Sequence, residues 1–64
     1  MSEWIVVTSC NTGKKMAIPT RNIAFVEEND RTDVYNGRRA TIHLIDGSEL
    51  VVYDSFNDIG EKIK

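Results

Sequence analysis

The sequence predicts a mostly β (α+β) fold with about five antiparallel strands, arranged in hairpins that form a curved sheet or a small barrel, and one C-terminal amphipathic helix. Short runs of β-branched and aromatic residues alternate with turn residues, which is typical of strands in hairpins. The C-terminal residues instead carry apolar side chains at helical spacing. The strands are expected near residues 4–9, 15–19, 23–29, 39–45 and 49–53, and the helix near 55–63.

The first two expected strands form a hairpin. Asn11 and Gly13 lie between them, and both residue types tolerate the backbone of a turn. Pro19 cannot donate a ladder hydrogen bond, so it marks the end of the second strand or an edge position.

A polar stretch, residues 29–39, follows the third expected strand. It contains Asn36 and Gly37, a pair that favours a turn. The stretch is expected to be the longest loop of the chain, or to extend the flanking strands as a long hairpin arm. The sequence leaves both alternatives open.

Asp46 and Gly47 lie between two alternating apolar runs, and such a pair favours a hairpin. A two-residue loop would pair Leu44 with Glu49 and mix polar and apolar residues on both faces. A three-residue loop, with Gly47 in the left-handed conformation, pairs Leu44 with Ser48 instead. Because a buried face strongly specifies register, we expect the three-residue loop. It places an apolar set on one face: Ile42, Leu44, Leu50 and Val52.

The expected C-terminal helix is short and must be held by packing. Ser55 and Asp58 resemble a capping box at its start. Gly60 costs the helix about 1 kcal/mol relative to alanine. Its apolar face is expected to cover the apolar face of the last hairpin, and it consists of Phe56, Ile59 and Ile63.

The chain is expected to form one domain, 1–64, because so few residues cannot hold two cores. Small domains often need disulfides, a metal or a partner subunit. Cys10 is the only cysteine, so it cannot form an internal disulfide. Cys10 and the single histidine, His43, cannot make a four-ligand zinc site. No metal or cofactor is expected, and self-association is the support left open unless the core suffices alone.

The charges also limit the expected function. Eight basic and ten acidic residues give a net charge of −2, which argues against a general nucleic-acid binder. No apolar run approaches the ~18 residues of a membrane-spanning helix. The N-terminus lacks the basic and apolar regions of a signal peptide. With one unpaired cysteine, the expected location is the cytoplasm.

The candidate binding residues are apolar, aromatic and basic side chains that the helix would leave uncovered. Contiguous exposed apolar surface marks interaction sites. We therefore expect a small non-enzymatic protein-interaction or regulatory module that acts through a sheet face or an edge strand, as a homo-oligomer. The expected partner-binding residues are Trp4, Val51 and Tyr53, with Arg38 and Arg39 at the rim.

Two other functions remain as alternatives. A nucleic-acid-binding regulator would use basic side chains on phosphates, although interleaved acidic residues favour a solvated surface. A small-ligand or anion binder at a subunit interface is the second alternative. An enzyme is not expected, because the sequence offers no set of acid, base and nucleophile and no catalytic residue can be named. The basic residues of the first alternative are Lys14, Lys15, Arg31, Arg38 and Arg39.

Cys10 and His43 carry reactive groups, but structural roles are favoured for both. The thiolate of Cys10 would need a cation beside it, which Lys14 or Lys15 could supply. His43 lies opposite Glu49 in the expected register, and ordinary cross-strand pairing explains that pair.

From Ile42 to Ile59, the strand, the Asp-Gly turn, the Val-Val strand, the acidic-Ser step and the terminal helix resemble the small flagellar FlbD-type proteins. Gly13 before a strand and the run from Ile23 to Glu28 fit the same pattern. The pattern also resembles the β-rich DNA-binding domain of LytTR response regulators. The resemblance implies the fold more than a function and supplies no catalytic residues.

Overall fold

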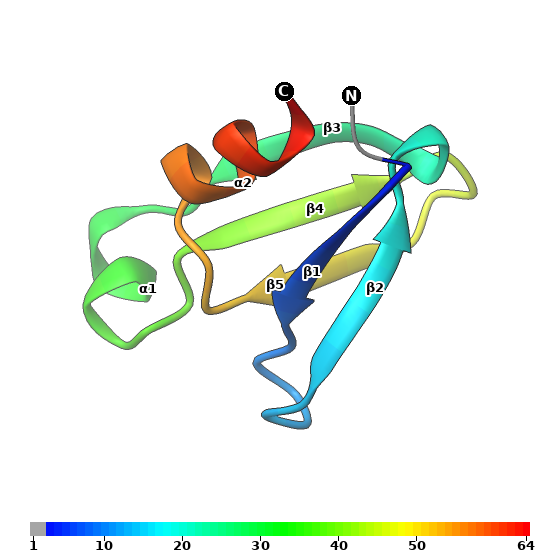
Figure 1. The fold of residues 1–64 in the computed structure, drawn as a ribbon. Helices are drawn as coiled ribbons and strands as arrows, with labels where there is room; N and C mark the ends of the chain where they lie inside the picture. Colours follow the sequence, from blue (N-terminus) through cyan, green and yellow to red (C-terminus); the bar gives the residue numbers. More distant parts are fainter. Residues whose placement is uncertain (1–2) are drawn as a thin grey trace.

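The computed structural model describes residues 3–64 and has the predicted fold class (Figure 1). Five antiparallel strands form curved β structure, and an amphipathic helix ends the chain. The elements are β1 (Trp4–Thr8), β2 (Lys15–Pro19), a 3-10 helix (Thr20–Asn22), β3 (Ile23–Glu28), α1 (Arg31–Tyr35), β4 (Ala40–Leu44), β5 (Glu49–Val52) and α2 (Phe56–Ile63).

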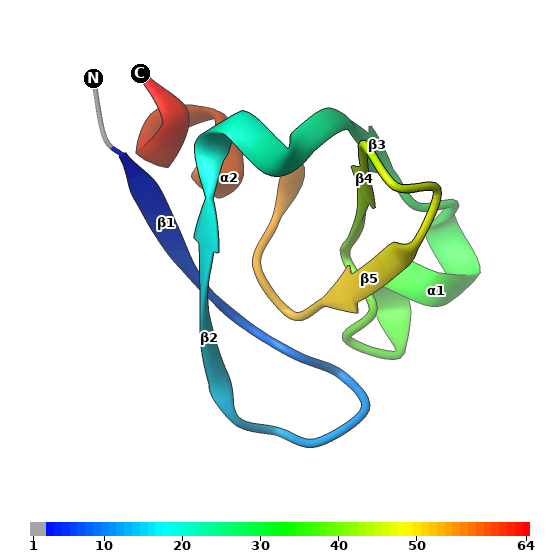
Figure 2. The same cartoon turned by 90° about the vertical axis from the view of Figure 1, so that its right-hand side faces the viewer.

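The strands form two sheets that meet at one corner. One sheet contains β1 and β2, and the other has the order β3-β4-β5. Ser9, just after β1, pairs with Val52 of β5. The amide of Tyr53 also donates to the carbonyl of Thr8 at 2.9 Å. The strands therefore follow the order β2-β1-β5-β4-β3 without closing into a barrel. Figure 2 shows the β1–β2 hairpin beside the three-stranded sheet.

The hairpin of β4 and β5 has the predicted three-residue loop. The amide of Leu44 donates to the carbonyl of Ser48 at 2.9 Å, and Gly47 has a φ of 92°. Such a φ is easy for glycine and strained for other residues. Ile42 and Val52 are fully buried on the predicted apolar face, so the register prediction is confirmed.

The helix α2 has the predicted cap, because Ser55 Oγ accepts a hydrogen bond from the amide of Asp58 at 3.1 Å. Ile59 is its one fully buried side chain, whereas Phe56 is 43% exposed. The helix packs against β1 and β3, so it covers the gap between those strands rather than the β4–β5 face alone (Figure 1). The core consists of Ile5, Val7, Ile18, Ala40, Ile42, Val52 and Ile59.

Residues 29–39 form neither a long open loop nor a hairpin arm. They contain α1, a single short helix. Asp30 Oδ1 accepts a hydrogen bond from the amide of Asp33 at 3.0 Å and caps its start. The φ of Gly37 is 90°, and this left-handed residue reverses the chain after the helix. The local capping by Asp30 explains why the polar stretch is helical.

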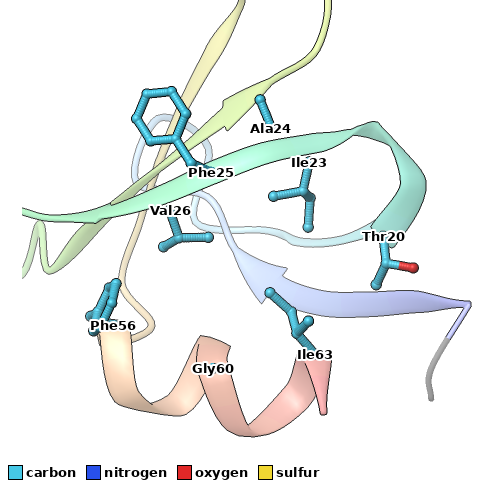
Figure 3. A pocket seen from close by; sticks show the side chains of 8 residues that line it. All are labelled: Thr20, Ile23, Ala24, Phe25, Val26, Phe56, Gly60 and Ile63. Atoms are coloured by element: carbon cyan, nitrogen blue, oxygen red, sulfur yellow. The ribbon is translucent and has the colours of Figure 1, made fainter.

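A β-bulge shapes β3. Ile23 pairs with Leu44 but Phe25 pairs with His43, so the strand holds one extra residue, Ala24, between two pairs. The extra residue lets Ile23 and Val26 face the interior although they are three positions apart. Phe25 points to the opposite side (Figure 3).

Candidate functional site

An apolar groove of about 380 Å³ lies between β3 and α2 (Figure 3). Ile23 and Val26 extend from β3 toward the helix, and Phe56 and Ile63 extend from the helix toward the strand. Its volume falls in the range of ligand sites, about 300–1,000 Å³. The groove is lined by Thr20, Ile23, Ala24, Phe25, Val26, Phe56, Gly60 and Ile63.

Gly60 keeps the middle of the groove open. It lies one helical turn after Phe56, on the helix face that borders the groove. A Cβ atom at this position would have no other atom within 4 Å, so a longer side chain would extend into free space. A glycine inside a helix costs about 1 kcal/mol relative to alanine. The open groove therefore coincides with a locally weakened helix.

The groove lies alongside the free edge of β3, which pairs with β4 only. The amide of Asn29 donates to the carbonyl of Arg39 at 3.2 Å. Hydrogen-bonded and non-bonded pairs alternate along an antiparallel ladder. Asn29 is a hydrogen-bonded position of the β3–β4 ladder, so every second residue between it and the β-bulge is bonded to β4 as well. Val26 and Glu28 are the residues between these positions, and they direct their N–H and C=O groups away from β4. Within residues 3–64, the structure shows no hydrogen bond to these outward groups.

The outer edge of β1 differs from the edge of β3, because side chains and backbone groups of other segments bond to it. Lys62 Nζ donates to the carbonyl of Val6 at 2.7 Å. The amide of Thr8 donates to Asp54 Oδ1 at 2.7 Å, and its carbonyl accepts from Tyr53. Unpaired strand edges invite pairing with another chain. Of these two edges that adjoin α2, only that of β3 is open.

Opposite charges lie at the two ends of β3. Arg21 precedes the strand in the 3-10 helix, and Glu27 and Glu28 end it. All three side chains are exposed. Glu61 of α2 forms an ion pair of 3.2 Å with Lys64, which follows the helix. The segment 21–28, which borders the groove, therefore begins with a basic residue, is apolar in its middle and ends with two acidic residues.

The structure brings four of the five expected partner-binding residues into one region. The amide of Arg39 donates to the carbonyl of Val52, beside Val51. Tyr53 lies against Gly37, next to Arg38, and is 44% exposed.

Trp4 is separated from this region. It pairs with Pro19 at the opposite end of β1 from the junction with β5 (Figure 1). Trp4 is 60% exposed, so it does not fill the core. The expected set therefore forms two surfaces instead of one.

The basic residues considered for nucleic-acid binding come from three separate segments. Lys14 and Lys15 lie at the β1–β2 turn, and Arg31 begins α1. Asp30 caps the same helix and Asp33 lies in its first turn, so acidic groups adjoin this arginine. The last two basic residues, Arg38 and Arg39, precede β4.

His43 takes part in a polar cluster on the outer face of the sheet. Its Nε2 lies 3.1 Å from Glu27 Oε1, and its Nδ1 lies 3.5 Å from Glu49 Oε1. Its ring stacks on Phe25, with 4.1 Å between the centroids. The sequence predicts the Glu49 contact but not the two contacts from β3. These contacts indicate a structural role for the imidazole of His43.

The setting of Cys10 disfavours a reactive thiolate. Burial raises the pKa of the Cys10 thiol. The Arg38 guanidinium opposes this rise and the Asp54 carboxylate adds to it. The thiolate is the reactive form, so the structure gives Cys10 no activation.

Neither a metal cluster nor a membrane-spanning helix occurs in the part of the chain that the structure describes. No three His, Cys, Asp or Glu side chains of residues 3–64 are grouped to hold a metal ion. No helix in this range is long and apolar enough to cross a bilayer.

Sequence reasoning missed the groove, although two patterns point to it. Phe56, Gly60 and Ile63 share one helix face, where the glycine leaves a gap between two large side chains. Ile23 and Val26 are three apart in a strand, a spacing that only a bulge places on one face.

Comparisons with protein-family models, curated proteins and solved structures found no match to this chain.

Proposed function

We propose that this protein is a small, non-enzymatic protein-interaction module that binds an extended segment along the free edge of β3. The observation that carries the proposal is the meeting of an open strand edge with an apolar groove. In such binding, main-chain hydrogen bonds supply affinity and pockets for alternate side chains supply specificity. The segment's main chain bonds to Val26 and Glu28, and its apolar side chains enter the groove.

The same proposal places the protein in the cytoplasm and allows it to self-associate. The free thiol of Cys10 suits a reducing compartment. A second copy can supply the extended segment, because any chain with a free strand edge can add to a sheet.

A selection from a phage-displayed library of short random peptides tests the proposal. Selected peptides are expected to shift the amide NMR signals of Ile23, Val26 and Phe56 in the labelled protein. The variant Gly60→Leu places a side chain in the groove and is expected to abolish binding. Leucine is a better helix former than glycine, so this variant keeps its fold.

Val6→Thr is the matched control, because Val6 is exposed on the outer face of β1, away from the groove. This variant is expected to bind the selected peptides as the wild type does. Peptides that bind Gly60→Leu unchanged, or that shift only signals outside β3 and α2, would overturn the proposal.

A further inference from the structure

The segment 21–28, which contains β3 and borders the groove, has charges and apolar side chains that match those of a second, antiparallel copy. We propose that the occupant of the β3 edge is β3 of a second copy, paired antiparallel across a two-fold axis near the middle of the strand. This inference rests on the proposed function and names its partner. A two-fold interface uses the same surface of both subunits, so the segment has to match its own reverse.

The charge order of the segment meets this requirement. Arg21 precedes β3 and Glu28 ends it. Antiparallel pairing brings Arg21 of each copy toward Glu28 of the other, so opposite charges meet at both ends of the interface. Like charges placed opposite each other would destabilise the pair. Parallel pairing would place arginine near arginine and glutamate near glutamate.

The apolar middle of the strand supports the same arrangement. Phe25 is 56% exposed on the outer face, although it stacks on His43 on one side. When a sheet continues across a two-fold axis perpendicular to it, both copies keep the same outer face. The two Phe25 side chains then lie beside each other near the axis and shield one another from water. Exposed apolar side chains gain stability when they are covered in this way.

The backbone groups also suit the pairing. Val26 lies near the middle of β3 and directs its N–H and C=O outward, because its neighbours in the β3–β4 ladder form the hydrogen bonds to β4. Around a two-fold axis at the Ala24–Phe25 bulge, the N–H of Val26 faces the outward C=O of Ile23 in the second copy, and the same register places Arg21 opposite Glu28. The two three-stranded sheets then join into one sheet, and the β3 edge of each copy is paired. Association of this kind stabilises a small fold by mass action.

Sedimentation equilibrium of the intact protein and two charge-reversal variants tests the proposal. The wild type is expected to form a dimer. Arg21→Glu and Glu28→Lys are each expected to raise the dimer dissociation constant at least about tenfold, which corresponds to ~1.4 kcal/mol. Circular dichroism confirms that each variant is folded. Arg31→Glu makes the same change in charge on α1 and is expected to leave the dissociation constant unchanged.

The mixture of the two variants is the decisive arm. When the Arg21→Glu protein pairs with the Glu28→Lys protein, opposite charges meet at both ends of the antiparallel heterodimer. The equimolar mixture of the two single variants is therefore expected to dimerise as the wild type does. A monomeric wild type at high concentration, unaffected single variants, or a mixture that stays monomeric would overturn the proposal. Peptides that bind in the groove of a monomeric protein, and are lost in Gly60→Leu, would leave the proposed function standing.

Discussion

Lys62 Nζ donates a hydrogen bond of 2.7 Å to the backbone carbonyl of Val6. This contact joins the C-terminal helix to the outer edge of the first strand, across most of the sequence. The same ammonium lies 3.5 Å from Asp54 Oδ2. The helix α2 therefore covers the outer edge of β1 and leaves the edge of β3 open.

Lys62→Met tests the stability that this contact provides. Methionine keeps an unbranched apolar side chain but cannot donate a hydrogen bond. Its loss is expected to lower the free energy of unfolding by about 1 kcal/mol, the usual worth of a partly exposed hydrogen bond. Urea denaturation followed by circular dichroism measures the change. Lys64→Met, at an exposed ion pair on the same helix, is expected to change stability by less than half as much.

Asp54→Ala should have a larger effect than Lys62→Met. Asp54 Oδ1 accepts from the amide of Thr8 at 2.7 Å, and its side chain is only 16% exposed. Removing the acceptor leaves the amide of Thr8 unsatisfied, and such a loss costs about 2 kcal/mol. The same denaturation experiment measures it. A stability equal to the wild type would show that the carboxylate does not hold this strand edge.

Gly60→Ala is expected to stabilise the protein. The added Cβ meets no atom within 4 Å, and alanine is favoured over glycine in a helix by about 1 kcal/mol. The melting temperature should therefore rise, whereas the small methyl group should weaken peptide binding in the groove less than Gly60→Leu does. A fall in melting temperature would mean that the position is more crowded than the structure indicates.

Asp46 gives a prediction on pH. Its Oδ1 accepts hydrogen bonds from Ser48 Oγ at 2.6 Å and from the Ser48 amide at 2.9 Å. These bonds lower the pKa of Asp46 below its ordinary value of 3.8. A lowered pKa in the folded state adds stability above 3.8 that is lost as the pH falls through the folded-state pKa.

The hydroxyl of Ser48 is the largest cause of that lowered pKa. Ser48→Ala is therefore expected to be less stable than the wild type near neutral pH, and the two proteins should become more similar as the pH falls below 3.8. Urea denaturation of both proteins across this range measures the difference. A difference that stays constant with pH would contradict the assigned role of the hydroxyl.

Local patterns predicted the features that depend on a few neighbouring residues. The Asp46-Gly47 turn, with its pairing of Leu44 and Ser48, follows from one buried face that fixes the register. The helix cap at Ser55 follows from the preference of a hydroxyl for the first free amides of a helix. Both features are set within one hairpin or one turn.

The features that sequence reasoning missed depend on contacts between distant segments. The bulge at Ala24 appears only when β3 is paired with β4. The gap at Gly60 becomes a groove only when α2 lies beside β3. The partner-binding residues named from the sequence lie outside the groove, and they are Trp4, Arg38, Arg39, Val51 and Tyr53.

Amide hydrogen exchange along β3 tests the central claim most directly. In the monomeric protein, the amides of Phe25 and Glu27 are expected to be protected by β4, and those of Val26 and Glu28 are expected to exchange quickly. When a selected peptide binds, Val26 and Glu28 should become protected while the β1 amides change little. Slow exchange at Val26 and Glu28 in the monomeric protein without the peptide, or no added protection when the peptide binds, would contradict the account of β3 as an open edge.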